Sequence, residues 1–174
     1  MNIRQATKAD AEEIRRLFYN TVHTVNRRDY SPKQTRAWAS PEKDVAPWEA
    51  RQDSRLVFVA EQNAQIAGFA ELEGNGHIDC FYCHKDFQRQ GIGTALLNHL
   101  VSIAEALEMS RLFADVSITA LPFFSHHRFT VVTAQEVMHR GAAFLNYKME
   151  RRLTPTLSAS KSFTAAPSGD LFPE

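Results

Sequence analysis

The chain's strongest constraint is a change of hydrophobic period between residues 77 and 107. Residues 77–83 are apolar and rich in strand-forming side chains, and the glycine-containing segment 88–93 follows them. A stripe with the 3.6-residue period of a helix comes next, made by Ile92, Ala95, Leu96, His99, Leu100, Ile103 and Leu107. A second strand-like run follows at 112–116. A helix between two strands predicts a crossover, which places those strands parallel in one sheet.

Hydrophobic patterns and end signals predict further elements on both sides of this unit. We expect strands over residues 2–6, 56–60, 66–72, 131–139 and 143–151, and helices behind the Thr7–Asp10 and Ser31–Gln34 capping boxes, around Trp48 and over 121–127. The order of elements predicts an α/β fold with one mixed sheet of about six to seven strands. We expect one domain over 1–152 and a disordered tail over 153–174, which is rich in Ser, Thr, Ala and Pro.

The composition is that of an ordinary globular domain and excludes several functions. The 174 residues are 44% hydrophobic, and 20 acidic residues balance 20 basic ones, so nothing indicates nucleic acid as a partner. No apolar run approaches the roughly 20 residues that cross a bilayer, so no membrane partner is expected. Residues 1–5 lack a signal-peptide core and are typical of a strand, so the expected compartment is the cytoplasm.

Two cysteines, Cys80 and Cys83, have the CxxC spacing of a redox pair. A redox pair normally opens a helix, where the helix dipole lowers the pKa of the thiol. These two lie in a strand-like run, and an odd spacing places them on opposite faces of a strand. We therefore expect two small buried residues rather than a redox centre.

The segment Gln88-Arg89-Gln90-Gly91-Ile92-Gly93-Thr94 is the strongest candidate for a binding site. The first amides of a helix lack internal partners and carry partial positive charge, which suits a phosphate. Two glycines allow close backbone approach, and Arg89 adds a fixed positive charge. Neither the Walker A pattern nor the three-glycine dinucleotide fingerprint is present. A glycine-rich turn without a ligand is the alternative.

These residues resemble a known family, the GNAT superfamily of N-acetyltransferases. The match to its (Arg/Gln)-x-x-Gly-x-(Gly/Ala) signature is Gln88-x-x-Gly91-x-Gly93, and the segments at 3–10, 66–70, 78–84 and 120–124 resemble its neighbouring strands and loops. The resemblance covers about residues 1–151, and Tyr30-Ser31-Pro32-x-Gln34-x-x-Ala37-Trp38 resembles a small bacterial branch. The resemblance implies a GNAT fold splayed between strands four and five, with acetyl-CoA as the acetyl donor and no metal.

The resemblance also implies which residues bind acetyl-CoA. The amides of residues 90–94 would bind the pyrophosphate beside Gln88 and Arg89. The backbone of Phe81, Tyr82 and Cys83 would pair with the pantetheine arm, and one amide there would stabilise the oxyanion of the tetrahedral intermediate. Ser117 replaces an asparagine that many members place near the cofactor, and Phe124 lies on the same side.

Transfer to an amine needs a base, because a free alkyl amine has a pKa near 10. The family's usual positions imply Asp79 first, then His77, then Glu71. The usual acid is a tyrosine at the position of Phe124, which cannot donate a proton. Tyr82 and Tyr147, or His126 and His127, are the candidate substitutes. Each of these residues has a structural alternative.

The acceptor side is implied to lie between the first helix and the second strand, where Tyr30 and Trp38 could hold a substrate. A small-molecule amine is the expected acceptor, with a protein N-terminus or lysine as the alternative. The missing tyrosine leaves open a non-catalytic acyl-CoA-binding or regulatory module. Use of a longer acyl group, or ester formation, is a third possibility. The chain is expected to be a monomer or a homodimer.

Overall fold

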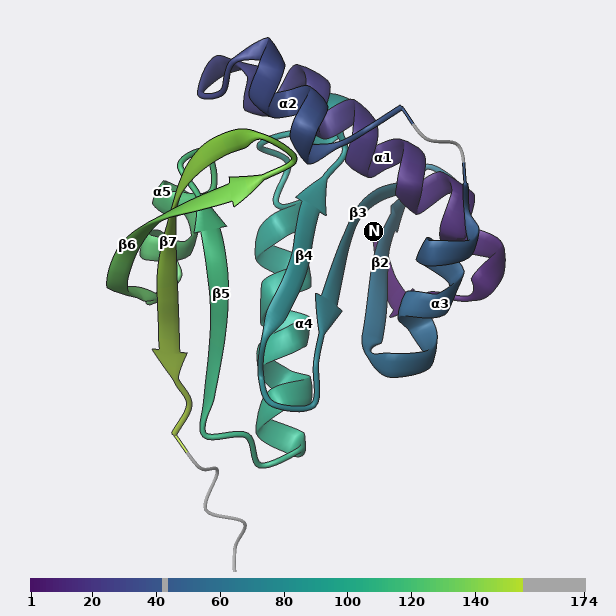
Figure 1. Ribbon diagram of the computed structural model, residues 1–174. Coiled ribbons are helices and arrows are strands. Elements are labelled where there is room, and N and C mark those ends of the chain that lie inside the picture. Colours follow the sequence, from purple (N-terminus) through teal and green to yellow (C-terminus); the bar gives the residue numbers. More distant parts are fainter. Residues whose placement is uncertain (42–43, 155–174) are drawn as a thin grey trace, which may run out of the picture.

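The computed structural model describes residues 1–41 and 44–154 (Figure 1). Within them, seven strands form two antiparallel sheets. The first sheet has the order β1 (Asn2–Gln5), β2 (Leu56–Gln62), β3 (Gln65–Leu72), β4 (Ile78–Cys83). The second has the order β5 (Arg111–Ser117), β7 (Ala142–Arg152), β6 (Thr130–His139). The expected strands are all present.

The helices of the described residues also match the expected segments. They are α1 (Ala11–Thr24), α2 (Pro32–Trp38), α3 (Ala46–Ser54), α4 (Ile92–Ala106) and α5 (Leu121–His126), with single 3-10 turns η1 (Lys8–Asp10), η2 (Asn26–Arg28) and η3 (Lys85–Phe87). Both predicted capping boxes form, at Thr7 with Asp10 and at Ser31 with Gln34. None of the described helices has the length and apolar character needed to span a bilayer.

The two sheets meet where β4 and β5 run in the same direction. The expected parallel pair is there, but it is reduced to one bridge between His77 and Phe113, supported by Phe113 N–H donating to the Gly76 carbonyl at 3.0 Å. Beyond that bridge no backbone hydrogen bond joins β4 to β5 among the described residues. The mixed sheet therefore splays between β4 and β5, as the resemblance implied, and separates into two sheets along this line.

Helices cover both faces of the first sheet, with α1 and α3 on one side and α4 on the other (Figure 1). The larger core cluster joins α4 to strands of both sheets, and a smaller one joins α1 to the first sheet. Gly68 lets α4 approach β3 closely, because a Cβ there would lie 2.8 Å from Cγ2 of Ile92. The helix that follows the glycine turn is thus fixed firmly against the sheet.

The buried face of α4 differs from the predicted stripe at its end. Leu107 is 56% exposed and lies past the last helical residue. Leu97, Val101 and Ala104 are buried instead. A helix that packs across two diverging sheets buries a wider face than one stripe of period 3.6, so the predicted buried face was too narrow and extended one residue past the helix.

The folded part of the chain extends to Leu153 at the C-terminal end. Leu153 is buried, and its N–H donates to the Ser110 carbonyl at 2.9 Å, so the folded part includes this residue. The expected disorder of 155–174 lies outside the described residues.

Cys80 packs in the cluster on the α1 side and Cys83 against the cluster on the α4 side, as free thiols on opposite faces.

Candidate active site

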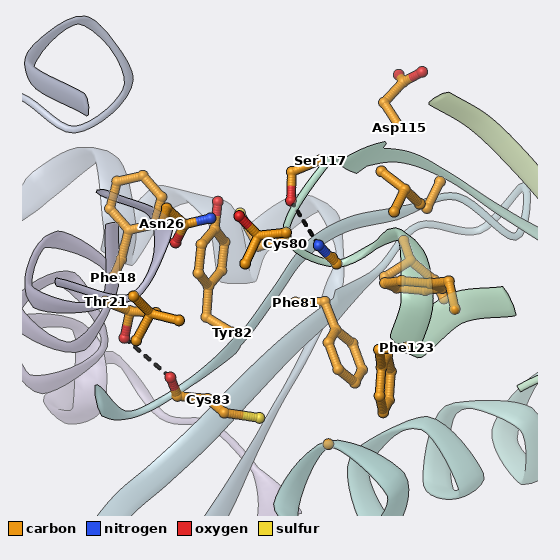
Figure 2. Close-up of a pocket in the computed structure, with 18 of the residues that line it drawn as sticks. Phe18, Thr21, Asn26, Cys80, Phe81, Tyr82, Cys83, Asp115, Ser117 and Phe123 are labelled. Carbon is orange, nitrogen blue, oxygen red and sulfur yellow. Dashed lines mark hydrogen bonds between the residues drawn. The ribbon is translucent and has the colours of Figure 1, made fainter. Parts of the chain in front are cut away.

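A cleft of about 1030 Å³ opens where β4 and β5 separate (Figure 2). It extends from the glycine turn at the start of α4 to the aromatic side chains of α2 and β7. β4 is the edge strand of its sheet, so its free edge borders this cleft. The cleft therefore places a helix N-terminus, a strand edge and a group of aromatic rings along one surface.

A β-bulge in β4 determines which side chains reach the cleft. Leu72 pairs with Ile78 and Ala70 pairs with Phe81, so three steps along β4 oppose two steps along β3. The extra residue lies at Asp79 and Cys80 and reverses the alternation of faces. Ile78 consequently packs on the α4 side, whereas Cys80 packs on the α1 side.

The glycine turn has the geometry of an anion site. Gly91 is the N-cap of α4 at φ 82°, and a Cβ built there would meet nothing within 4 Å. Arg89, at φ 62°, lines the cleft and has no ion pair with any described residue. A 15-residue helix therefore points uncapped amides and an unpaired guanidinium at open space. A phosphate group fits this arrangement.

The other predicted turn residues divide into two groups. Gln88 holds the turn to β4, because its amide nitrogen donates to the Cys83 carbonyl at 2.8 Å and the His84 carbonyl at 3.1 Å. The side chain of Gln90 bonds the Asp86 carbonyl and does not line the cleft. Ile92, Gly93 and Thr94 all line it.

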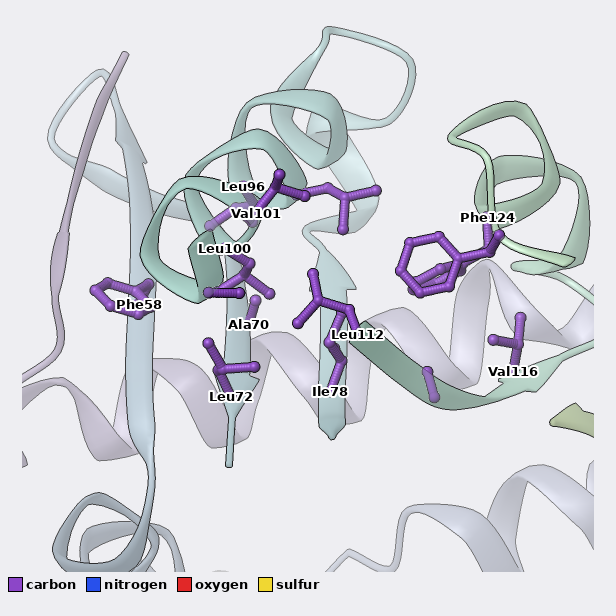
Figure 3. Close-up of a cluster of buried hydrophobic side chains, with 14 of the residues drawn as sticks. Phe58, Ala70, Leu72, Ile78, Leu96, Leu100, Val101, Leu112, Val116 and Phe124 are labelled. Carbon is purple, nitrogen blue, oxygen red and sulfur yellow. The ribbon is translucent and has the colours of Figure 1, made fainter. Parts of the chain in front are cut away.

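Two phenylalanines form the wall opposite β4. Phe124 is 3% exposed and packs edge-on against Phe81 and Phe129, which explains why this position carries no polar group (Figure 3). A Cβ at Gly93 would lie 3.1 Å from the Phe123 ring, so a glycine is needed for that contact. Apolar rings thus bound the cleft where the sheets diverge.

His127 lies at the phosphate end of the cleft. Its Nε2 is 3.2 Å from Thr94 Oγ1, and its ring packs on Phe123. Burial, together with the nearby His126 and Arg151, lowers its pKa, so the neutral ring is favoured. This position near the start of α4 favours a role in cofactor binding over one as a catalytic acid.

The three predicted base candidates lie in different environments. Asp79 lines the cleft. Glu71 is 1% exposed beneath it, and burial raises its pKa. His77 lies outside the cleft lining, where its ring stacks on Phe113 and its Nδ1 is 3.3 Å from Glu73. Only Asp79 of these three is placed to meet a substrate directly.

Two arginines that the sequence analysis missed hold these carboxyl groups. Arg51 Nη1 donates to Glu71 at 2.8 Å, and Arg51 Nη2 donates to Asp79 at 3.3 Å. Arg55 bonds the same two carboxylates and lies 3.4 Å from Glu73. Arg51 lies in the last turn of α3, whereas Arg55 is the extended residue that follows the helix, so no helical spacing indicated that both would meet these carboxylates.

The same cluster has atoms that could bind a metal. Ligand atoms of Glu71, Asp79 and Cys80 lie within 4.8 Å of one another. Arg51 donates to all three, at distances of 2.8 to 3.3 Å. The guanidinium therefore already supplies the positive charge that this group of ligands would attract.

The two candidate tyrosines are placed differently. Tyr82 lines the cleft, with its ring stacked on Phe69 and edge-on to Phe18, and burial raises its pKa well above the ordinary value. Tyr147 lies on β7, where it pairs with Val116 of β5. It packs against the larger core cluster and does not line the cleft. Tyr82 can reach a substrate, whereas Tyr147 is part of the core.

The end of the cleft opposite the glycine turn is lined by aromatic rings, and Tyr30 contacts its neighbours there through both packing and hydrogen bonds. The Tyr30 ring packs on Trp38 and Phe144, with centroid distances of 5.1 and 5.9 Å. Its hydroxyl donates to the Leu145 carbonyl and accepts from Ile118 N–H at 2.9 Å. Ser117 also lines this end, and its Oγ accepts from Ala120 N–H at 3.2 Å.

A sheet split between two parallel strands, with a helix N-terminus suited to a phosphate at the split, is the arrangement expected of acyltransferases that take an acyl group from a CoA thioester. Residues 26–151 match the family model described as the acetyltransferase (GNAT) domain. The chain belongs to the GNAT family, and it is an acetyl-CoA-dependent acyltransferase.

Similar proteins agree with this assignment. The chain is 34% identical over 149 residues to the uncharacterized N-acetyltransferase YafP of Escherichia coli, covering 86% of this chain and 94% of YafP. A GCN5-related N-acetyltransferase structure from Rhodopseudomonas palustris has a TM-score of 0.83 at 30% identity, covering 87% and 95% of the two chains. The PaiA N-acetyltransferase of Thermoplasma acidophilum, solved in complex with coenzyme A, has a TM-score of 0.72 at 16% identity, covering 87% and 98%.

Proposed function

We propose that this protein transfers the acetyl group of acetyl-CoA to a primary amine of a small molecule, by direct attack while both substrates are bound. The observation that carries the proposal is the continuous cleft, whose phosphate end and aromatic end lie on one surface. α2 covers the aromatic end, and Gln34 of α2 donates to the Ala143 carbonyl of β7 at 2.8 Å. A covered end suits a small acceptor better than a protein chain.

The donor would occupy the half of the cleft that begins at the glycine turn. The amides of residues 90–94, with Arg89, would bind its phosphates. The free edge of β4 at Phe81–Cys83 offers backbone groups to the pantetheine arm, as an added strand would use them. An amide there would stabilise the negative oxygen that forms on the carbonyl under attack. The PaiA complex with coenzyme A supports this choice of donor.

Asp79 is the residue we propose to take the proton of the acceptor amine, directly or through water. It lines the cleft on β4, and ion pairs with Arg51 and Arg55 hold it in position. Its carboxylate would hold the ammonium group of the acceptor and accept the proton that the amine loses. Glu71 would support Asp79 through the shared arginines.

The leaving thiolate needs little help, because a thiol is far more acidic than an amine. Tyr82 keeps its proton because its pKa is raised well above the ordinary value by burial. Its hydroxyl would therefore act as a hydrogen-bond donor to the sulfur rather than as a full proton donor. Phe124 has no part in this step.

The experiment is thiol release from acetyl-CoA with a panel of amines, for the wild type and for Asp79→Asn. We expect Asp79→Asn to lower kcat about 100-fold at pH 7 with unchanged acetyl-CoA binding, and the loss to shrink near pH 10, where the amine is already neutral. His77→Asn is the control, with a change below about threefold, because His77 lies outside the cleft. If the Asp79→Asn variant turned over at the wild-type rate, Asp79 would be excluded as the residue that takes the proton.

A further inference from the structure

The positive charges of the cleft are distributed unequally. Among the described residues that line it, the basic side chains are three arginines (Arg28, Arg51 and Arg89) and three histidines (His126, His127 and His139), with no lysine. Arg89 stands unpaired at the phosphate end. Arg28 Nε bonds Asp29 at 2.9 Å, and Arg51 bonds Glu71 and Asp79. An acidic group on the acceptor would meet no unpaired arginine or lysine at the aromatic end, where His139 is the one basic side chain that lines the cleft without an ion pair to the described residues.

Carboxyl groups are in excess at this end. The cluster beneath β4 sets Glu71, Glu73 and Asp79 against two guanidinium groups, those of Arg51 and Arg55, and Glu73, which lies outside the cleft lining, also contacts His77 at 3.3 Å. Asp115 also lines the cleft; its Oδ1 accepts from the Gln135 amide at 3.0 Å, and no cationic side chain among the described residues pairs with it. The local charge therefore favours a positively charged ligand.

The aromatic rings add to this preference. Phe18 and Tyr82 line one wall, and the other carries Tyr30, Trp38 and Phe144. The faces of such rings attract ammonium groups through their quadrupole. They also bury the apolar body of a small amine. Both walls thus suit an organic cation.

Two neutral amides supply hydrogen bonds without adding charge. Asn26 is 5% exposed and lines the cleft, and its side chain has no hydrogen bond to the described residues. Asn146 lines the cleft on β7 opposite Ser117, and its Oδ1 is buried without a partner. A ligand that reaches Asn146 would supply the missing bond.

From these charges and groups we infer that the acceptor is a cationic amine that carries no carboxylate or phosphate, and that Asn146 binds it through an uncharged polar group. This inference rests on the proposed function and narrows its substrate class. Amines related to amino acids by loss of the carboxyl group fit the cleft, whereas the amino acids themselves do not.

Matched compounds test the inference directly. We would compare 2-phenylethylamine, phenylalaninamide and phenylalanine, and the pairs cadaverine with lysine and agmatine with arginine, by thiol release at saturating acetyl-CoA. In each pair that is turned over, the expected kcat/KM is at least tenfold higher for the amine than for the amino acid. The kcat/KM of phenylalaninamide should be close to that of 2-phenylethylamine. Equal or faster turnover of the amino acids would overturn the inference.

The role of Asn146 has its own test. Asn146→Ala should raise the KM of the best acceptor about tenfold while kcat and the KM of acetyl-CoA stay within twofold. Thr133→Ala is the control, because Thr133 is exposed on the neighbouring strand β6 and does not line the cleft. An unchanged acceptor KM in Asn146→Ala would refute its role as an anchor.

A failure of the proposed function would look different. Silence across the whole amine panel, with acetyl-CoA binding confirmed, would refute amine acetylation itself. Calorimetric titration of the same matched compounds into the CoA-saturated protein would then decide the inference by binding alone. Tighter binding of the amino acid in the matched pairs would overturn it, and tighter binding of the decarboxylated amine would support it.

Discussion

At the residue scale, a substitution at Gly91 should have the largest effect on acetyl-CoA binding. Its left-handed backbone and the open space around its Cα would allow a phosphate to approach closely. Gly91→Glu adds bulk and negative charge at that spot. We expect loss of acetyl-CoA binding, with Kd raised at least 100-fold, measured by calorimetry.

The chain supplies a control of the same kind. Gly141 has φ 74°, and a Cβ there also meets nothing within 4 Å, but it lies in the β6–β7 turn outside the cleft lining. Gly141→Glu carries a similar backbone strain, about 1–2 kcal/mol, without touching the cofactor site. Retained tight binding in Gly91→Glu, or equal loss in both variants, would refute the phosphate assignment.

The sequence could predict some site residues and not others, for a physical reason. Gly91 and Arg89 were predictable because a phosphate site at a helix start needs local chemistry that a short motif contains. Arg51 and Asn146 were not, because their partners and the cleft surface come from strands distant in sequence. His77 and Tyr147 have suitable chemistry, but the fold places them outside the cleft.

At the scale of elements, Asp10 joins β1 to the start of α1. Arg4 donates to both carboxylate oxygens of Asp10 at 2.8 Å, and Arg4 also bonds Glu61 of β2. The hydrogen bond from Arg4 lowers the pKa of Asp10 to about 2, from an ordinary value of 3.8. Because the folded pKa is lowered, this stabilisation is fully present above pH 4 and is lost as the pH falls toward 2.

Asp10→Asn should therefore lower the free energy of unfolding by about 1–2 kcal/mol at pH 7, and by progressively less below pH 4. Urea denaturation at pH 7, 5, 4 and 3 would measure the difference. Asp53→Asn is the control, because Asp53 pairs with Lys8 on the exposed surface and should change stability by less than about 0.5 kcal/mol. A pH-independent difference at Asp10 would contradict this role.

The elements themselves were largely predictable, whereas their irregularities were not. Periodicity and capping residues identified the strands and helices because the signals are local, and both capping boxes form. The bulge at Asp79 and Cys80 adds one residue to β4, and no alternation pattern shows it. Simple alternation placed His77 and Asp79 on one strand face, whereas only Asp79 reaches the cleft.

At the scale of the whole molecule, one core connects two sheets that share almost no hydrogen bonds at their junction. Ile78 of β4 and Leu112 of β5 belong to the same buried cluster, which α4 completes. The sheets should therefore unfold together in one transition, although a ligand-sized cleft separates them. A donor that lies in this cleft contacts both sheets and stabilises the folded state as a unit.

The stabilisation has a calculable size. Acetyl-CoA at 100 times its Kd should add about 2.7 kcal/mol, which for a domain of this length raises Tm by roughly 5–10 °C. Scanning calorimetry should show a single peak that moves intact, and Gly91→Glu should show no movement. Two separate peaks, of which acetyl-CoA moves only one, would mean that the sheets fold independently. The shared core under α4 would then be too weak to couple them, and the cleft would lie between two units rather than within one.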